Sequence, residues 1–232
     1  MAWRNHFLDN LDEADLAALR PSLRTVELRR DQLLDEAGQP VRAALLPLDC
    51  ILSVLTVMRD GRTVESRTIG HESGYGLLHA LGSRISFERV ITQVAGTAYE
   101  LPVATLSEAA ATRPSLTQAI VRHAQASLVQ AAQSTACNTL HGAEHRLCRW
   151  LLLTQDRLRA DVLPLTQEHL AVMLGVQRTT VTALASELQA KNLISYSRGR
   201  IRILDRDSLL RCACECYEAI ERGAERVLNG DD

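Results

Sequence analysis

The stretch "LAVMLGVQRTTVTALASEL", residues 170–188, has the pattern of two short amphipathic helices that meet at one glycine. Thr166 stands where it can cap the first helix, and Gly175 stands where that helix is expected to end. A second helix is predicted from Arg178 to about Ala190, after a three-residue turn. Helix pairs of this kind occur in ordinary cores, and also as helix-turn-helix units that place one helix in a DNA groove.

The two faces of the second predicted helix favour the DNA-binding alternative. One face is an apolar stripe at helical spacing, formed by Val181, Leu184, Ala185 and Leu188. The other face has short side chains at Thr179, Thr182, Ala183 and Ser186, with Arg178 at the helix start. Such side chains let a helix approach DNA closely and bond phosphates and base edges. The segment "YSRGRIRIL" then predicts an arginine-rich hairpin, or wing, that turns at Arg198-Gly199 and lies on flanking phosphates.

Composition limits the kind of protein. The chain has 232 residues, enough for one large domain or two ordinary ones, and 46% of them are hydrophobic. No stretch approaches the ~18 apolar residues of a membrane span, and the opening segment lacks the apolar region of a signal peptide. We therefore expect a cytoplasmic protein that makes no membrane contact. The formal net charge is -2, but residues 165–206 carry six basic against three acidic side chains, so positive charge gathers near the helix pair.

The N-terminal third has the alternation of β-strands. "ILSVLTVMRDGRTVESRTIG" predicts a hairpin that turns at Asp60-Gly61, with short strands before and after it. Regularly spaced short strands predict a closed antiparallel unit such as a barrel or jelly roll, entered through a short helix in "DNLDEADLAALRP". We assign residues 1–113 to a β-roll sensor domain.

A long helix is predicted from Pro114 to about Leu140, with a dimerisation segment over residues 114–142. One small β domain cannot cover such a helix, so its own copy in a second subunit is the expected partner. The alternative is a single helix packed on its own domain. The predicted seam residues are Leu116, Ile120, Ala124, Leu128 and Ala131.

Residues 143–232 are assigned to the DNA-binding domain, and their final helix is predicted to start after Asp207 and to continue through "CACEC". On one helix, Cys212 and Cys216 share a face that Cys214 does not. We therefore predict buried thiols, with a metal or redox role as the alternative. His141 and His145 have a metal-compatible spacing, but two ligands fall short of a site, so we predict no metal. We find no catalytic motif and expect no enzyme.

The order of β-roll, long helix and winged helix-turn-helix resembles the Crp/Fnr family of bacterial transcription regulators. The resemblance is sharpest over "LTQEHLAVMLGVQRTTVTALASELQAKNLISYSRGRIRIL". It implies an α+β fold and a homodimer that binds palindromic double-stranded promoter DNA, with RNA polymerase as a further partner. The alternative is a ligand-sensing module whose helical C-terminal region docks a protein. The predicted DNA-contacting residues are Thr166, Gln167, Gln177, Arg178, Thr179, Thr180, Thr182, Ala183, Ser197, Arg198 and Arg200.

The sequence departs from this family at the effector site. Members that respond to cyclic AMP carry an Arg-Ser pair for its phosphate, where Ser86 and Phe87 stand here, and hydroxyls where Ala131 and Ala132 stand. The lost guanidinium predicts no binding of cyclic AMP through the usual contacts. No cofactor is predicted, and a different effector is left open. The segment "TIGHESGYGLL" resembles the family's glycine-rich effector loop, and the predicted effector-binding residues are Gly70, Glu72, Arg84, Ser86, Phe87 and Arg89.

Two further departures concern other branches of the family. The oxygen-sensing branch binds an iron–sulfur cluster through N-terminal cysteines, whereas the first cysteine here is Cys50, so that mechanism is not expected. In the second helix, Thr179 replaces a glutamate and Ala183 replaces a second arginine of the common pattern. Because those groups bond cytosine and guanine, we expect a different half-site.

Overall fold

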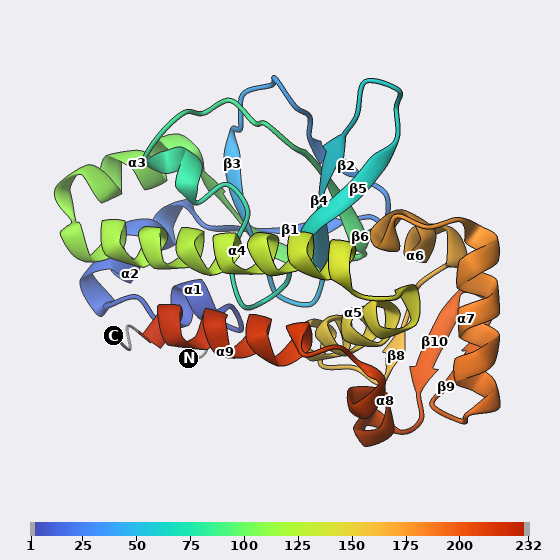
Figure 1. The fold of residues 1–232 in the computed structure, drawn as a ribbon. Coiled ribbons are helices and arrows are strands. Elements are labelled where there is room, and N and C mark those ends of the chain that lie inside the picture. The colour runs from blue at the N-terminus through green and yellow to red at the C-terminus, as the bar shows by residue number, and fades with distance from the viewer. Residues whose placement is uncertain (1–2, 230–232) are drawn as a thin grey trace.

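Two antiparallel sheets form the N-terminal part of the computed structural model, which describes residues 3–229 (Figure 1). In pairing order, the first sheet contains β1 (Arg24–Leu28), β7 (Gly96–Pro102) and β3 (Ala43–Pro47). The second contains β2 (Leu33–Asp35), β6 (Arg89–Val94), β4 (Ile51–Val57) and β5 (Thr63–Ile69). The sheets enclose one core, in which Leu46, Leu52 and Leu101 are fully buried. The predicted β-roll is therefore confirmed.

The β4–β5 hairpin turns at Asp60-Gly61, as predicted. The Asp60 carboxylate accepts the backbone N–H of Arg62 at 3.0 Å, and the Met58 N–H donates to the Arg62 carbonyl at 2.8 Å. Asp supports such turns because its short side chain can bond the backbone two residues further on.

Short helices close the ends of the roll. They are α1 (His6–Asp9), α2 (Glu13–Leu19), the 3₁₀ helices η1 (Arg20–Ser22) and η2 (Leu78–Ala80), and α3 (Val103–Thr112). The Asp12 side chain caps α2 by accepting the Asp15 N–H, which confirms the predicted entry helix. Phe7 and Leu19 are fully buried in the same core as the sheets.

The long helix α4 (Pro114–Leu140) lies across the roll, with proline in its first turn and extended backbone at His141 after its end (Figure 1). Leu116 and Ile120 are fully buried in the core of the same chain. The prediction that these two residues belong to a subunit seam is therefore wrong, because the first turns of α4 are needed to cover the roll.

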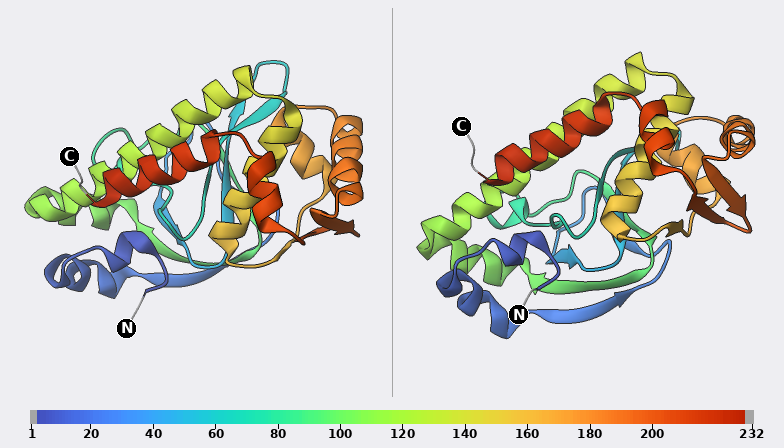
Figure 2. Two further views of the ribbon diagram at one scale, coloured as in Figure 1. Left: turned by 60° about the horizontal axis from the view of Figure 1, so that its bottom comes forward. Right: turned by 90° about the horizontal axis from the view of Figure 1, so that it is seen from below.

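The C-terminal part contains helices, one small sheet and a final helix that returns along α4. Its elements are α5 (Ala143–Leu158), β8 (Val162–Leu163), α6 (Gln167–Leu174), α7 (Arg178–Ala190), β9 (Ile194–Ser197), β10 (Arg200–Ile203), α8 (Arg206–Cys212) and α9 (Cys216–Asn229). Figure 2 shows α9 running beside α4 in both views, and Gly223 packs so near Val129 that a side chain at this position would clash with it. None of the helices in residues 3–229 is both long and apolar enough to cross a membrane.

The prediction of one final helix starting after Asp207 is wrong. Asp205 caps α8 by accepting the Ser208 N–H, and α8 ends at Cys212. Ala213 is extended, with φ −73° and ψ 156°, and α9 starts at Cys216. The break lets two cysteines of the "CACEC" segment face α4, which a continuous helix would not allow. The last three residues of the predicted domain, 230–232, lie outside the described residues.

Buried polar contacts hold the C-terminal part on the roll. Trp150 of α5 donates its indole N–H to the Glu65 carboxylate of β5 at 2.9 Å. The same carboxylate accepts from Ser53 at 2.6 Å and from Gln93 at 3.0 Å. Burial raises the pKa of Glu65 despite these three donors. Helix α5 thus joins the two parts through a shared polar cluster.

Candidate nucleic-acid interface and associated cavities

The helix pair α6–α7 has the ends that the sequence predicts. The Thr166 hydroxyl accepts the His169 N–H at 3.2 Å, and α6 ends at Leu174. Gly175 has φ 62°, a left-handed conformation that closes a helix at little steric cost only in glycine. The second helix, α7, begins at Arg178 and ends at Ala190, as expected.

The two faces of α7 also agree with the prediction. Val181, Ala185 and Leu188 are buried against the C-terminal core, and Leu184 is partly buried. Nine of the eleven predicted DNA contacts are exposed, namely Gln177, Arg178, Thr179, Thr180, Thr182, Ala183, Ser197, Arg198 and Arg200. Thr166 and Gln167 are half-buried.

Internal hydrogen bonds orient part of the exposed face of α7. The Thr182 hydroxyl lies 2.9 Å from Gln167 Oε1 and 3.0 Å from the Arg178 carbonyl oxygen. The Ser186 hydroxyl donates to the Thr182 carbonyl at 2.9 Å. When the Gln167 amide oxygen is occupied in this way, its NH₂ group remains as a donor toward a phosphate or base.

The wing is a hairpin of β9 and β10, with β8 pairing on the other side of β10. Its turn residues Arg198 and Gly199 have φ 48° and 72°, the double left-handed geometry that suits a tight hairpin. Arg200 and Arg202 are exposed while Ile201 is fully buried, so the strand alternates as expected for a half-buried sheet. The wing therefore presents arginines beside α7.

A cavity of about 750 Å³ lies between α4, β5 and the loop over residues 74–88. Among the described residues that line it, Phe87 is the sole member of the predicted effector-binding set. Phe87 itself is 79% exposed. The other five residues lie outside this cavity, so the structure does not gather the predicted effector-binding residues around it.

Four of those five residues are held by internal contacts, whereas the side chain of Arg84 is exposed. The Glu72 carboxylate accepts from Arg157 Nε at 2.8 Å, and the backbone of Gly70 lies against the same arginine. Arg89 pairs with Glu36 at 2.7 Å. Ser86 is buried with its hydroxyl donating to the Glu88 carbonyl, and the Arg84 backbone carbonyl accepts from Val41. Similarity in sequence could not show that Arg157 of α5 would bond Glu72 and pack on Gly70 in the loop after β5.

The cavity is largely apolar, and its charges are paired. Arg67 makes two bonds to Glu88, at 2.6 and 2.8 Å. His123 Nδ1 lies 3.0 Å from the Ser73 hydroxyl oxygen. Burial lowers the pKa of His123 to about 4. Burial also lowers the pKa of His79. At neutral pH the described lining residues therefore offer no unpaired cation to an anionic ligand.

An apolar stripe on α4 borders this cavity and is open to solvent. Val121 is 40% exposed and Leu128 is 69% exposed. Ala124, Ala131 and Thr135 continue the stripe at alternating spacings of three and four residues. This is the spacing at which helices pair in a coiled coil.

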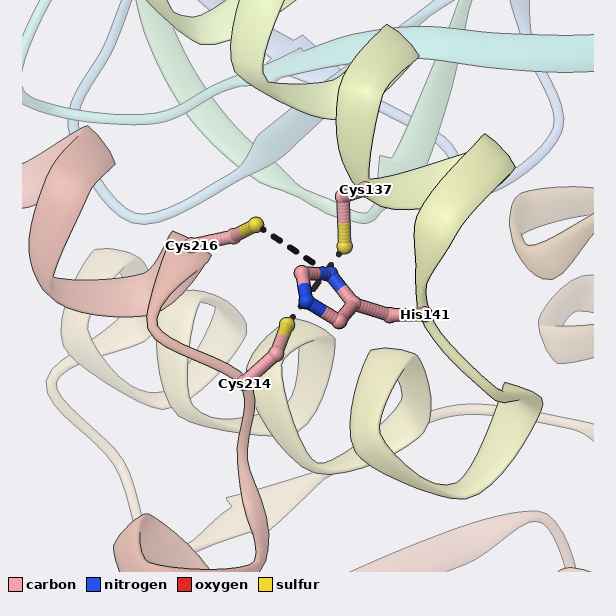
Figure 3. Close-up of side chains that lie close together, drawn as sticks. All are labelled: Cys137, His141, Cys214 and Cys216. Carbon is pink, nitrogen blue, oxygen red and sulfur yellow. Dashed lines mark hydrogen bonds between the residues drawn. The ribbon is translucent and has the colours of Figure 1, made fainter.

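A cluster of thiols lies where α4 ends (Figure 3). Cys137, His141, Cys214 and Cys216 each point one sulfur or nitrogen atom inward, and these atoms all lie within 4.8 Å of one another. The sequence predicts no metal site, whereas the structure brings four potential ligands together. The missed signal was the pair of close spacings, Cys-x₃-His and Cys-x-Cys, considered jointly. Of the two predicted histidines, only His141 belongs to the cluster, while His145 bonds the Cys212 carbonyl.

The β-roll, the exposed α7 and the arginine wing together define a β-roll joined to a winged helix-turn-helix unit. Residues 145–212 match the model of the Crp-like helix-turn-helix domain. No curated protein sequence matches the chain. The match to the domain model identifies residues 145–212 as a Crp-like helix-turn-helix domain, which is a DNA-binding domain.

Solved structures show the same fold over most of the chain. FixK2 from Bradyrhizobium japonicum is 16% identical, with a TM-score of 0.72, and the match covers 83% of this chain and 98% of that one. A putative Crp/Fnr-family transcriptional regulator from Eubacterium rectale is 17% identical, with a TM-score of 0.69, covering 88% and 95%. The c-di-GMP responsive regulator CLP of Xanthomonas campestris is 14% identical, with a TM-score of 0.68, covering 84% and 100%. The fold is thus that of a Crp/Fnr-type transcription regulator.

Proposed function

We propose that the chain is a transcription regulator that binds palindromic DNA as a homodimer. The observation that carries this proposal is the exposed face of α7, where Arg178, Thr179 and Thr182 stand beside the wing arginines. In a winged helix-turn-helix protein this face enters the major groove while the wing lies on the backbone. RNA polymerase is the expected further partner.

The homodimer part of the proposal is supported by the open stripe on α4. Leu128 is 69% exposed, an unusual position for a leucine in the middle of a helix that otherwise packs on its own chain. A second copy related by two-fold symmetry would cover this stripe and present a second α7. Two such helices read half-sites about one DNA turn apart.

The test is selection of bound sequences from random double-stranded DNA by the full chain. We expect an inverted repeat bound by two chains, with an affinity that falls steeply as salt rises, because arginines displace counterions from phosphates. A bound complex with one chain on an asymmetric site would contradict the homodimer. Absence of any selected DNA would contradict the proposed function and favour a protein-docking module.

We further propose that the cavity takes a small, mostly apolar ligand rather than cyclic AMP. Arg67 is occupied by Glu88, and Ser86 turns its hydroxyl toward the Glu88 carbonyl. A cyclic phosphate entering there would find no free guanidinium, which costs on the order of thirty-fold to a thousand-fold in affinity. Calorimetry should show no micromolar binding of cyclic AMP, and a micromolar heat that raises DNA affinity would refute this assignment.

A further inference from the structure

We propose that Cys137, His141, Cys214 and Cys216 bind one thiophilic divalent metal ion of the zinc class. Cys137 lies in the last turn of α4, and His141 directly follows the helix. Cys214 and Cys216 come from the break between α8 and α9. Three cysteines and one histidine are an established ligand set for structural zinc.

The spacing of the ligand atoms fits a single ion. The Sγ atoms of Cys137 and Cys214 are 3.5 Å apart, and Cys216 Sγ lies 3.5 Å from His141 Nδ1. A tetrahedral zinc ion with bonds of 2.3 Å to sulfur separates neighbouring sulfur ligands by about 3.8 Å. The observed atoms, all within 4.8 Å of one another, need only small shifts to reach this geometry. An iron–sulfur cluster would need cysteines farther apart, because its irons and sulfides lie between them.

The orientation of the His141 ring is the second observation. Its Nδ1 faces Cys216, while its Nε2 lies 3.2 Å from the Glu215 carboxylate. A carboxylate on the outer nitrogen holds the proton there and leaves the inner nitrogen free to bind a metal. Metal-bound histidines nearly always have such a partner, so Glu215 is assigned as a positioning residue.

The charges around the cluster also suit a thiolate site. Three thiolates and one divalent ion carry a net charge of −1. Arg149 of α5 is only 6% exposed, and its positive charge acts on Cys137, Cys214 and Glu65, but it makes no salt bridge within residues 3–229. This guanidinium would neutralise the loaded site. The Gln133 side chain adds a donor to Cys216 Sγ at 3.0 Å.

The three cysteines of the cluster are closed to solvent, and His141 is half-buried. Cys137 is 0% exposed, Cys216 1% and Cys214 7%, and the three pack as a small core of their own. Four protein ligands in such an environment leave no open position, which is the arrangement of a structural rather than a catalytic metal.

The position of the site suggests what the ion would control, and this step rests on the proposed function. His141 and Gly142 are the two residues that join α4 to α5. An ion bound there would fix the direction in which α5 and the helix-turn-helix leave the proposed dimer helix. Metal occupancy should therefore change DNA affinity, by about 5- to 150-fold for a typical coupling between two sites.

The metal is tested on the full chain, purified under reducing, oxygen-free conditions. After chelation we expect one Co²⁺ per chain to bind, with the strong visible absorption of tetrahedral cobalt and sulfur-to-metal bands, and to be displaced by Zn²⁺. C214S and C216S should each lose or strongly shift these bands. C212S is the matched control, because this cysteine belongs to the same segment but not to the cluster, and it should leave them unchanged.

Further arms distinguish the parts of the proposal. E215Q should keep the cobalt spectrum but weaken metal affinity by about 10- to 100-fold, which a merely structural residue would not do. No stoichiometric cobalt in the folded protein, or a Cys137–Cys214 disulfide in its place, would overturn the site. Equal DNA affinity with and without metal would overturn only the proposed effect of the metal on DNA binding, and would leave the metal site itself standing. Loss of all DNA binding in both forms would contradict the proposed function but not the metal site.

Discussion

Arg178 and the wing arginines should contribute differently to DNA binding. Arg178 is exposed at the first turn of α7, where a guanidinium can bond a guanine edge. R178A should lose about 1–3 kcal/mol on the best site and relax preference at one base position. Affinities for the selected site and its single-base variants will measure this.

The double variant R198A/R200A is the matched comparison. These side chains extend from the wing, where phosphates rather than bases are expected. All sequences should therefore weaken alike, and the slope of affinity against salt should become shallower by about one unit for each lost phosphate contact. If R178A weakened all sequences equally, α7 would not lie in the major groove as proposed.

His123 should make stability depend on pH. Its pKa is lowered from 6.5 to about 4 by burial, so the folded chain holds it neutral. The unfolded chain takes up a proton below about pH 6.5, so stability is complete above that pH and falls as pH drops toward 4. The total loss is about 3 kcal/mol from this group. Urea unfolding of wild type and H123Q at pH 7 and 4.5 will show a smaller loss in the variant. An equal loss in both proteins would mean that His123 does not titrate in this range.

At the scale of elements, charges on the open stripe of α4 should split the proposed dimer. The double variant L128E/A131E places two carboxylates where the second helix would pack, and buried unpaired charge is strongly destabilising. We expect monomers by light scattering and weaker binding to the palindrome.

The control for this pair is Q118E/A136E. Both positions are exposed and do not belong to the stripe, and the variant adds the same charge. It should remain dimeric. An intact dimer in L128E/A131E would place the subunit contact elsewhere.

Helix ends could be predicted from residues near them in the sequence. The partners of helix faces could not, because contacts between distant residues determine them. The ends of α6 and α7 follow from Thr166 and Gly175, since caps act within one turn of the helix. The faces of α4 follow from its periodicity, but periodicity does not say whether the same chain or a second one covers them. Leu116 and Ile120 were therefore assigned to the wrong partner.

The thiol cluster shows the same limit more sharply. The sulfurs of Cys137 and Cys214 are 3.5 Å apart but 77 positions apart in the chain. The break after α8 that makes this contact has no proline or glycine to signal it. Likewise, Glu72 was assigned to an effector because its partner, Arg157, lies on a distant helix.

For the whole molecule, the Arg157–Glu72 pair should couple the C-terminal part to the roll. Arg157 is 7% exposed and reaches from the last turn of α5 to Glu72 in the loop after β5. E72Q leaves this buried guanidinium without its counter-charge, which should cost about 3–5 kcal/mol. The double variant E72Q/R157Q should recover part of the loss, as measured by urea unfolding. R222Q, which breaks an exposed pair with Glu218, should change little. A loss in R222Q as large as in E72Q would show that the pair does not couple the two parts.

The cavity beside α4 has a consequence for how the protein responds to its own abundance. Two of its lining residues, Phe87 and Leu128, are 79% and 69% exposed, so one chain builds only part of the enclosure. In the proposed dimer a second chain supplies the missing wall. Any molecule that binds the completed cavity then favours association, and by mass action association equally favours that molecule. Dilution would release the ligand, and a rise in expression would capture it, so the cell's stock of this chain would itself set the threshold of response.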